Sequence, residues 1–238
     1  MSFFRLPKTL IKVTNSLMSK FWWGFTENLN KIAWMSWKKL GRKKDSWGLG
    51  FRELDCFNVA MLAKQGWRLL KFPKSLGARV IREKYYPGSN FLKSNLGKRP
   101  SFSWRSICQA KPLLEEGIIW RVGNGLNIKI WEDKWLPSTF SHKIQDPVRI
   151  LNREAKVVEI INLDTNWWNI PLIEHIFPME TVEKICSLAI SPRTQEDKLI
   201  WAGTKTRSFS VRSTYHLEVD RRVRVLGCFL ACMSSSTV

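Results

Sequence analysis

Residues 121 to 135, RVGNGLNIKIWEDKW, restrict the fold most, because they can form either a phosphate-binding loop or the turn of a β-hairpin. A phosphate loop needs glycines where the backbone approaches the anion, and then a helix whose first N–H groups face it. Here Ile128 takes the place of the third glycine, and Ile128 and Ile130 alternate with polar residues as in a strand. Asn-Gly also favours a type I′ turn. The sequence therefore predicts a β-hairpin near residues 118–131 and no nucleotide site.

Helical spacing dominates the residues before this segment. Apolar residues recur every three to four positions, and Pro, Gly, Ser and Asp stand where helices begin and end. The pattern predicts helices at residues 7–24, 55–73, 75–87 and 103–116, the last divided at Pro112. In the first of these, the apolar stripe is expected to be buried; it consists of Leu10, Leu17, Met18, Phe21 and Trp22.

The second half mixes short helices with short strands. Helices are expected at residues 156–162, 171–177 and 180–188, and strands at 198–202 and 208–211. From Arg221 the sequence loses periodicity. We therefore expect an α+β, mainly helical fold with three regions: a basic helical region 1–136 ending in the hairpin, a mixed connector 137–220, and a disordered or aberrant tail 221–238.

Positive charge is concentrated in the first of these regions. Residues 1–135 hold 26 basic and 9 acidic residues, a net charge of +17. Residues 136–220 hold 10 and 11, a net charge of −1, and the last eighteen add +3 to give the total of +19. Such a balance favours a polyanionic partner, and it places the surface that faces this partner in the N-terminal half.

The sequence gives little support for a membrane-spanning or a secreted protein. No apolar run approaches the ~20 residues that span a membrane, and the N-terminus lacks the order of segments of a signal peptide. Five scattered cysteines are expected to be free thiols in a reducing compartment. We expect an intracellular protein, in the nucleus rather than the cytoplasm.

No constellation of catalytic or metal-binding residues emerges. The three histidines, His142, His175 and His216, are far apart in sequence, and the adjacent carboxylate pairs point in different directions on a helix or strand. We expect no catalytic residue, no metal, no cofactor and no small-molecule substrate.

The run KKLGRKK is the best candidate for a binding site. It places five cations within seven residues, with three tryptophans near them: Lys38, Lys39, Arg42, Lys43, Lys44, and Trp34, Trp37, Trp47. Cations hold phosphates in a salt-dependent way. For these cations we predict contact with the phosphate backbone of RNA or DNA, and we expect the tryptophans to turn into the core. A solvated loop and a nuclear-import address are the alternatives.

Ordered blocks along residues 1 to about 220 resemble a known family. They read MSFFRLPKTLIKVTNSLMSKFWWG, GLGFRELDCFNVAMLAKQGWRLLK, REKYYPGSNFL, SFSWRSI, WRVGNGLNIKIWEDKWLP and DKLIWAGTKTRSFSVRSTYHL. This series resembles the reverse transcriptase polyprotein of plant non-LTR (long interspersed element type) retrotransposons, in the segment downstream of the palm. The resemblance implies a thumb and connection region that ends before the zinc-binding region, with the metal-binding aspartates of the polymerase upstream of Met1.

The sequence departs from the family pattern in two places. Trp47 stands where the family has a glycine before Leu-Gly-Phe, and the glycine that precedes Phe-Ser-Val is missing around Arg207-Ser208. We therefore expect a catalytically inactive fragment of such a polymerase that binds RNA or DNA without reading sequence. The alternatives are a structural remnant without a ligand, and a piece of a longer RNA-directed DNA polymerase.

Overall fold

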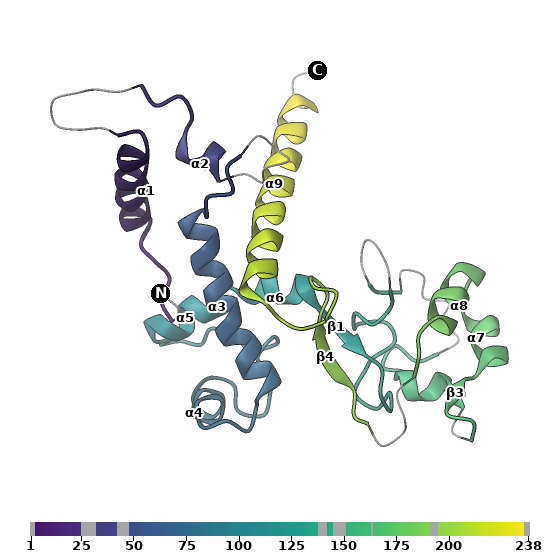
Figure 1. Cartoon of the computed structure of the whole chain (residues 1–238). Helices are drawn as coiled ribbons and strands as arrows, with labels where there is room; N and C mark the ends of the chain where they lie inside the picture. Colours follow the sequence, from purple (N-terminus) through teal and green to yellow (C-terminus); the bar gives the residue numbers. More distant parts are fainter. Residues whose placement is uncertain are drawn as a thin grey trace. The chain divides into compact units, whose positions relative to one another are not determined.

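A computed structural model of the chain describes residues 3–24, 32–41, 48–137, 142–144, 151–162, 164–190 and 195–235, with the backbone alone for residue 38 and residues 226–235. The chain divides into two compact units (Figure 1). The first unit contains residues 1–116 and 209–238, and the second contains residues 117–208. The sequence placed its main boundary at residue 136 instead, because it could not show that the segment after residue 208 returns to the first unit.

Helices build the first unit, and helix α3 (Leu54–Lys71) is central to it. The C-terminal helix α9 (Val211–Ser235) packs along α3, where the small side chains of Cys56 and Ala60 are fully buried next to Tyr215. The Tyr215 hydroxyl accepts a hydrogen bond from the Glu53 backbone N–H at 3.0 Å. Residues 221–235 are thus helical, and the expected disorder of this tail is wrong over that range. Tertiary contacts, which periodicity alone does not reveal, hold this helix at Arg221, Arg222 and Arg224.

Helix α1 (Lys8–Trp22) begins after Pro7, as predicted. The segment before it is attached to α3 by a pair of hydrogen bonds, from Leu6 N–H to the Asn58 side-chain oxygen and from the Asn58 amide to the Phe4 carbonyl, both 2.9 Å. The apolar stripe of α1 was expected to be buried, which is wrong: Leu17 is 61% exposed and Phe21 87%.

Three further helices complete the first unit, besides the short α2 described below. They are α4 (Leu76–Tyr85), α5 (Phe102–Cys108) and α6 (Lys111–Gly117). Pro112 lies at the start of α6, so the predicted division of this helical segment is confirmed. Ser101 caps α5 by accepting a hydrogen bond from Trp104 N–H at 3.2 Å, a contact that stabilises a helix by about 1 kcal/mol. Tyr85 and Tyr86 stack on the buried Trp104.

Two small antiparallel sheets organise the second unit. Strand β1 (Ile118–Arg121) pairs with β4 (Lys198–Trp201), in the register Ile118 with Trp201. The predicted hairpin is therefore wrong in its pairing, because β1 bonds to a strand from far along the chain and residues 127–131 do not fold back on it. Instead, the Ile130 N–H donates to the Ala155 carbonyl, and the Ile128 carbonyl accepts a hydrogen bond from the Val157 N–H, both at 3.0 Å.

The second sheet and two helices surround the core of this unit. The elements are the 3-10 helix η2 (Val157–Ile160), β2 (Ile161–Asn162), β3 (Trp167–Trp168), α7 (Ile170–Ile176) and α8 (Met179–Cys186). β2 pairs with β3. Residues 156–162 were expected to be one helix, and the structure replaces it with η2 and β2. Similarly, the strand expected at 208–211 does not form, because Ser210 begins helix α9 and accepts a hydrogen bond from Ser213 N–H.

The fold class is confirmed as α+β and mainly helical. Among the described helices, none combines the length and apolar character needed to cross a membrane. Cys56, Cys108 and Cys186 are free thiols, as expected.

Candidate nucleic-acid interface

The predicted cation run falls partly outside the described residues. Lys39 is exposed on the short helix α2 (Trp37–Leu40), which Ser36 caps. Lys38 lies in the same helix, and only its backbone is described. Arg42, Lys43 and Lys44 lie outside the described residues. The structure therefore positions one of the five predicted cations at the surface and leaves the others untested.

The tryptophans of this run do not all behave as expected. Trp34 is 81% exposed, contrary to the expectation that it turns into the core. Trp37 is half-buried and packs on Phe51 with ring centroids 5.1 Å apart. Trp47 lies outside the described residues.

Helix α3 carries a row of cations that sequence reasoning missed. Lys64, Arg68 and Lys71 are exposed and follow one another at spacings of four and three. Because an α-helix has 3.6 residues per turn, these spacings place the three side chains on one face. The opposite face is buried in the unit, with Leu62, Ala63 and Gly66 pointing inward. We call Lys64, Arg68 and Lys71 the α3 cation row.

The cation row belongs to a longer basic segment. Residues 64–105 contain eleven basic residues and one acidic residue, Glu83. Every one of the basic side chains is exposed: Lys64, Arg68, Lys71, Lys74, Arg79, Arg82, Lys84, Lys93, Lys98, Arg99 and Arg105. The excess of basic residues in this segment is visible in the sequence, whereas the exposure of all of them is known only from the structure.

A groove beside α3 and α9 continues the cation row. Its cavity volume is about 560 Å³, and Phe57 and Met61 line it from α3. These two residues precede Lys64 by seven and three positions, so they lie on the same helical face as the cation row. Arg52 and Arg212 also line the groove, and none of the described residues that line it is acidic. The Arg52 guanidinium lies 5.1 Å from the centroid of the Phe57 ring.

Acidic side chains of the first unit are engaged by arginines. Arg222 bonds to Glu218 at 2.7 Å and to Asp55 at 2.7 Å, and Arg5 contacts Asp55 at 2.6 Å. Arg221 and Arg224 both pair with Glu116. Carboxylates that are already paired compensate less of the charge on the α3 cation row, which leaves that face cationic.

Almost all of the positive net charge lies in the first unit. The first unit contains 27 basic and 9 acidic residues, a net charge of +18, and the second contains 12 and 11, a net charge of +1. Exposed cations on a scaffold of this charge can hold phosphates along a nucleic-acid backbone without contacting base edges.

The loop at Gly123, Asn124 and Gly125 binds an anion after all, but the anion is a side chain of this chain. The Asp197 carboxylate accepts hydrogen bonds from the backbone N–H groups of Gly123 at 2.8 Å, Gly125 at 2.9 Å and Asn127 at 2.8 Å. Successive N–H groups that converge in this way form an anion-binding nest. Because Asp197 fills the nest, it is a structural contact and no phosphate site.

Both glycines are required by this arrangement. A Cβ atom on Gly125 would lie 2.6 Å from the Val158 nitrogen, and Gly125 has a φ of +71°. A Cβ atom on Gly123 would meet the backbone of Glu196 at 2.7 Å. Within the described part of the chain, no three His, Cys, Asp or Glu side chains gather closely enough to hold a metal ion.

Comparison with known proteins finds two relatives in Arabidopsis thaliana. No family model and no solved structure matches the chain. A protein provisionally named as a ribonuclease H protein is 28% identical over 239 residues, which cover 98% of this chain. The chain spans 38% of the length of that relative. About 2% of 238 residues, roughly five, lie outside this match, so most of residues 221–238 lie within it.

The second relative is named as an uncharacterized mitochondrial protein. It is 44% identical over 137 residues, which cover 57% of this chain and 89% of that protein. Neither name refers to reverse transcription. At this identity and coverage, the chain belongs to the same family as the uncharacterized mitochondrial protein of Arabidopsis thaliana.

Proposed function

We propose that the chain binds the phosphate backbone of RNA or DNA without reading its sequence, through the α3 cation row and the neighbouring groove. The observation that carries this proposal is the exposure of all eleven basic side chains in residues 64–105, against one acidic residue. Lys38, Lys39, Arg42, Lys43 and Lys44 are a second contact in the same proposal. Lys and Arg at such positions release counterions from the nucleic acid, which makes binding salt-dependent.

We further propose that the chain is a catalytically inactive fragment of a retrotransposon reverse transcriptase. The resemblance of six ordered blocks supports this origin, and so does similarity to part of a longer relative with a ribonuclease H name. The family's catalytic aspartates have no counterpart among the matched blocks, so the proposal assigns binding to this chain and catalysis to none of its residues.

A second candidate is a structural remnant that binds no ligand, or a piece of a longer RNA-directed DNA polymerase. The exposed apolar stripe of α1 favours this candidate, since large exposed apolar patches mark surfaces that normally face another protein segment. Four of its five residues are exposed, Leu10, Leu17, Phe21 and Trp22, and Val13 beside them is exposed as well.

Fluorescence anisotropy separates the two candidates. A labelled RNA hairpin and a labelled DNA duplex are titrated with the full chain over a series of salt concentrations. Backbone binding predicts that log K falls linearly with log salt, with a slope of about −0.9 for each B-DNA phosphate contacted. Weak binding that is insensitive to salt favours the remnant.

Variants then locate the contact. The triple variant Lys64→Ala, Arg68→Ala, Lys71→Ala is expected to reduce the magnitude of the duplex slope by roughly 2 to 3. The matched control replaces three exposed cations of the second unit, Arg153, Lys184 and Lys205, with alanine. An equal reduction of the salt slope in both triple variants contradicts a localised interface. Primer extension by the wild-type chain with Mg²⁺ and dNTPs would overturn the assignment as inactive.

A further inference from the structure

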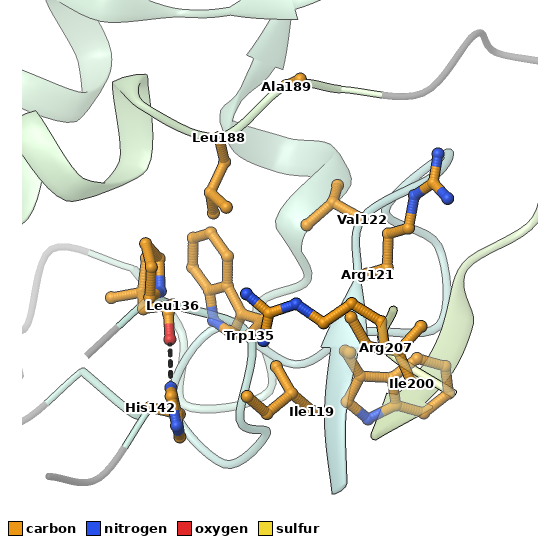
Figure 2. Close-up of a pocket in the computed structure, with 12 residues that line it drawn as sticks. Ile119, Arg121, Val122, Trp135, Leu136, His142, Leu188, Ala189, Ile200 and Arg207 are labelled. Carbon is orange, nitrogen blue, oxygen red and sulfur yellow. Dashed lines mark hydrogen bonds between the residues drawn. The ribbon is translucent and has the colours of Figure 1, made fainter. Parts of the chain in front are cut away.

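The second unit contains a pocket that the proposed backbone contacts do not use (Figure 2). Its cavity volume is about 540 Å³, which is within the range of small-ligand sites. Apolar and aromatic side chains form most of its wall: Ile119, Trp120, Trp135, Leu136, Leu188 and Ile200. The sheet positions two of them, because Ile119 on β1 is the direct partner of Ile200 on β4.

Among the described residues that line it, the polar ones are cationic or neutral and none is acidic. Arg121 and Arg207 contribute guanidinium groups, and His142 contributes an imidazole. Figure 2 shows the Arg207 side chain extending into the pocket in the direction of Trp135, whereas Arg121 points away from the interior. The Nδ1 of His142 is 2.8 Å from the Leu136 carbonyl oxygen, which fixes the ring beside the wall. The second unit has a net charge of only +1, so cations here are a local feature.

One strained residue, Arg207, lies at the same pocket. Three described residues other than glycine have positive φ, and two of them, His142 at 55° and Arg207 at 57°, line it. His142 and the third, Asn166, are residue types that adopt this conformation readily, so the strain falls on Arg207. At Arg207 the conformation is held by two hydrogen bonds, from Arg207 N–H to the Thr204 carbonyl at 3.1 Å and from Trp201 N–H to the Arg207 carbonyl at 3.0 Å. Strained residues of this kind gather at ligand sites.

We propose that this pocket binds one unpaired nucleotide of single-stranded RNA or DNA. The planar base lies against the half-buried residues of this wall, Trp120, Leu188 and Ile200, since Trp135 behind them is only 1% exposed. Bases lie in this way on the stacking surfaces of single-strand binding proteins. The adjoining phosphate bonds to Arg207, whose planar guanidinium matches phosphate geometry. A base within a duplex is stacked and paired, so a duplex cannot fill the pocket. The proposal therefore differs from backbone binding in its site and in its requirement for a free base.

Single-stranded probes test the requirement for a base. Anisotropy is measured on the full chain with labelled twelve-nucleotide uridine RNA and with an abasic oligomer of the same length and sugar–phosphate charge. The wild-type chain is expected to bind the uridine RNA at least about fivefold more tightly than the abasic oligomer, the lower limit for stacking one base. Equal affinities for the two probes would overturn the proposal.

Two variants address the pocket by different routes. Arg207→Asn removes the guanidinium and keeps a residue that tolerates positive φ, and Ala189→Trp fills the hollow from its exposed edge without changing charge. Ala189→Trp is expected to reduce the difference between the probes to less than twofold, and Arg207→Asn is expected to weaken binding of the uridine RNA because the phosphate contact is lost. Arg153→Asn, at an exposed arginine outside the pocket, is the matched control and is expected to keep the wild-type affinity and difference. If Ala189→Trp keeps that difference, or Arg207→Asn binds the uridine RNA as tightly as the control, the proposal is wrong.

Duplex binding separates this inference from the proposed function. The pocket variants are expected to leave the salt slope for duplex DNA unchanged, whereas the triple variant of the α3 cation row lowers that slope and keeps the difference between uridine and abasic probes. If the chain does not bind duplex DNA but binds the uridine RNA more tightly than the abasic oligomer, backbone binding is refuted and the pocket is supported.

Discussion

Replacing Asp197 with asparagine tests whether the anion-binding nest holds the second unit together. The carboxylate is 9% exposed and accepts three backbone hydrogen bonds. Asparagine has the same shape, and its single oxygen can keep the bonds to Gly123 and Gly125. Its amide group, however, must then face the Asn127 N–H, so a donor meets a donor and the third bond is lost.

The expected cost follows from these three bonds. A hydrogen bond to a charged group contributes about 1.5–3 kcal/mol, and the two bonds that remain become neutral and weaker. Asp197→Asn is therefore expected to destabilise the loop by about 2–3 kcal/mol. Asp197→Ala removes the acceptor of all three N–H groups, two of them buried, and is expected to cost about 3–5 kcal/mol.

Hydrogen exchange of the peptide that contains residues 122–128 measures this cost locally. Since 1.4 kcal/mol corresponds to a factor of ten, the Asn variant should exchange roughly 30- to 150-fold faster in this loop. Asp164→Asn, at an exposed carboxylate of the same unit, is the matched control and should change exchange there by less than about threefold. Equal protection in the two variants would refute the structural role of the nest.

Two other predictions concern the first unit. Arg222→Ala leaves Glu218, which is 4% exposed, without its closest partner. Because Arg222 is itself half-exposed, we expect the free energy of unfolding in urea to fall by about 1–3 kcal/mol, and by less than about 0.5 kcal/mol for the exposed control Arg79→Ala. Equal unfolding midpoints for the two variants would show that this network does not hold α9. Burial raises the pKa of the Cys56 thiol, so its reactive thiolate is scarce at pH 8. Iodoacetamide followed by peptide mass spectrometry should label Cys186 well before Cys56 in the native chain, and both equally in urea; comparable native rates would contradict the burial of Cys56.

Local signals in the sequence predicted the helices well. Pro7 precedes α1, Pro112 separates α5 from α6, and Pro87-Gly88 follows the end of α4. Each of these residues restricts the backbone of its own neighbourhood, so no knowledge of the tertiary structure was needed. The short helices α7 and α8 and the strand β4 were found by the same kind of pattern.

Long-range partners could not be predicted from those signals. Nothing near Ile118 indicates that its strand pairs with Trp201, and Asn-Gly favours a tight turn whether or not a carboxylate is close. The glycines at positions 123 and 125 predicted a tight turn, but no signal near them points to Asp197, which lies 72 residues after Gly125. The sequence thus identified the loop but not the anion that it binds.

The charge of the protein surface depends on both the sequence and the tertiary contacts. Arginines 221, 222 and 224 were assigned to an aberrant tail, where they would only add to the positive charge of the chain. In the structure they lie on α9 and contact Glu53, Asp55, Glu116 and Glu218, which are four of the nine acidic residues of the first unit. Carboxylates paired with these arginines compensate less of the charge on Lys64, Arg68 and Lys71. The C-terminal helix therefore supports a cationic surface on α3 through residues that need not touch nucleic acid themselves.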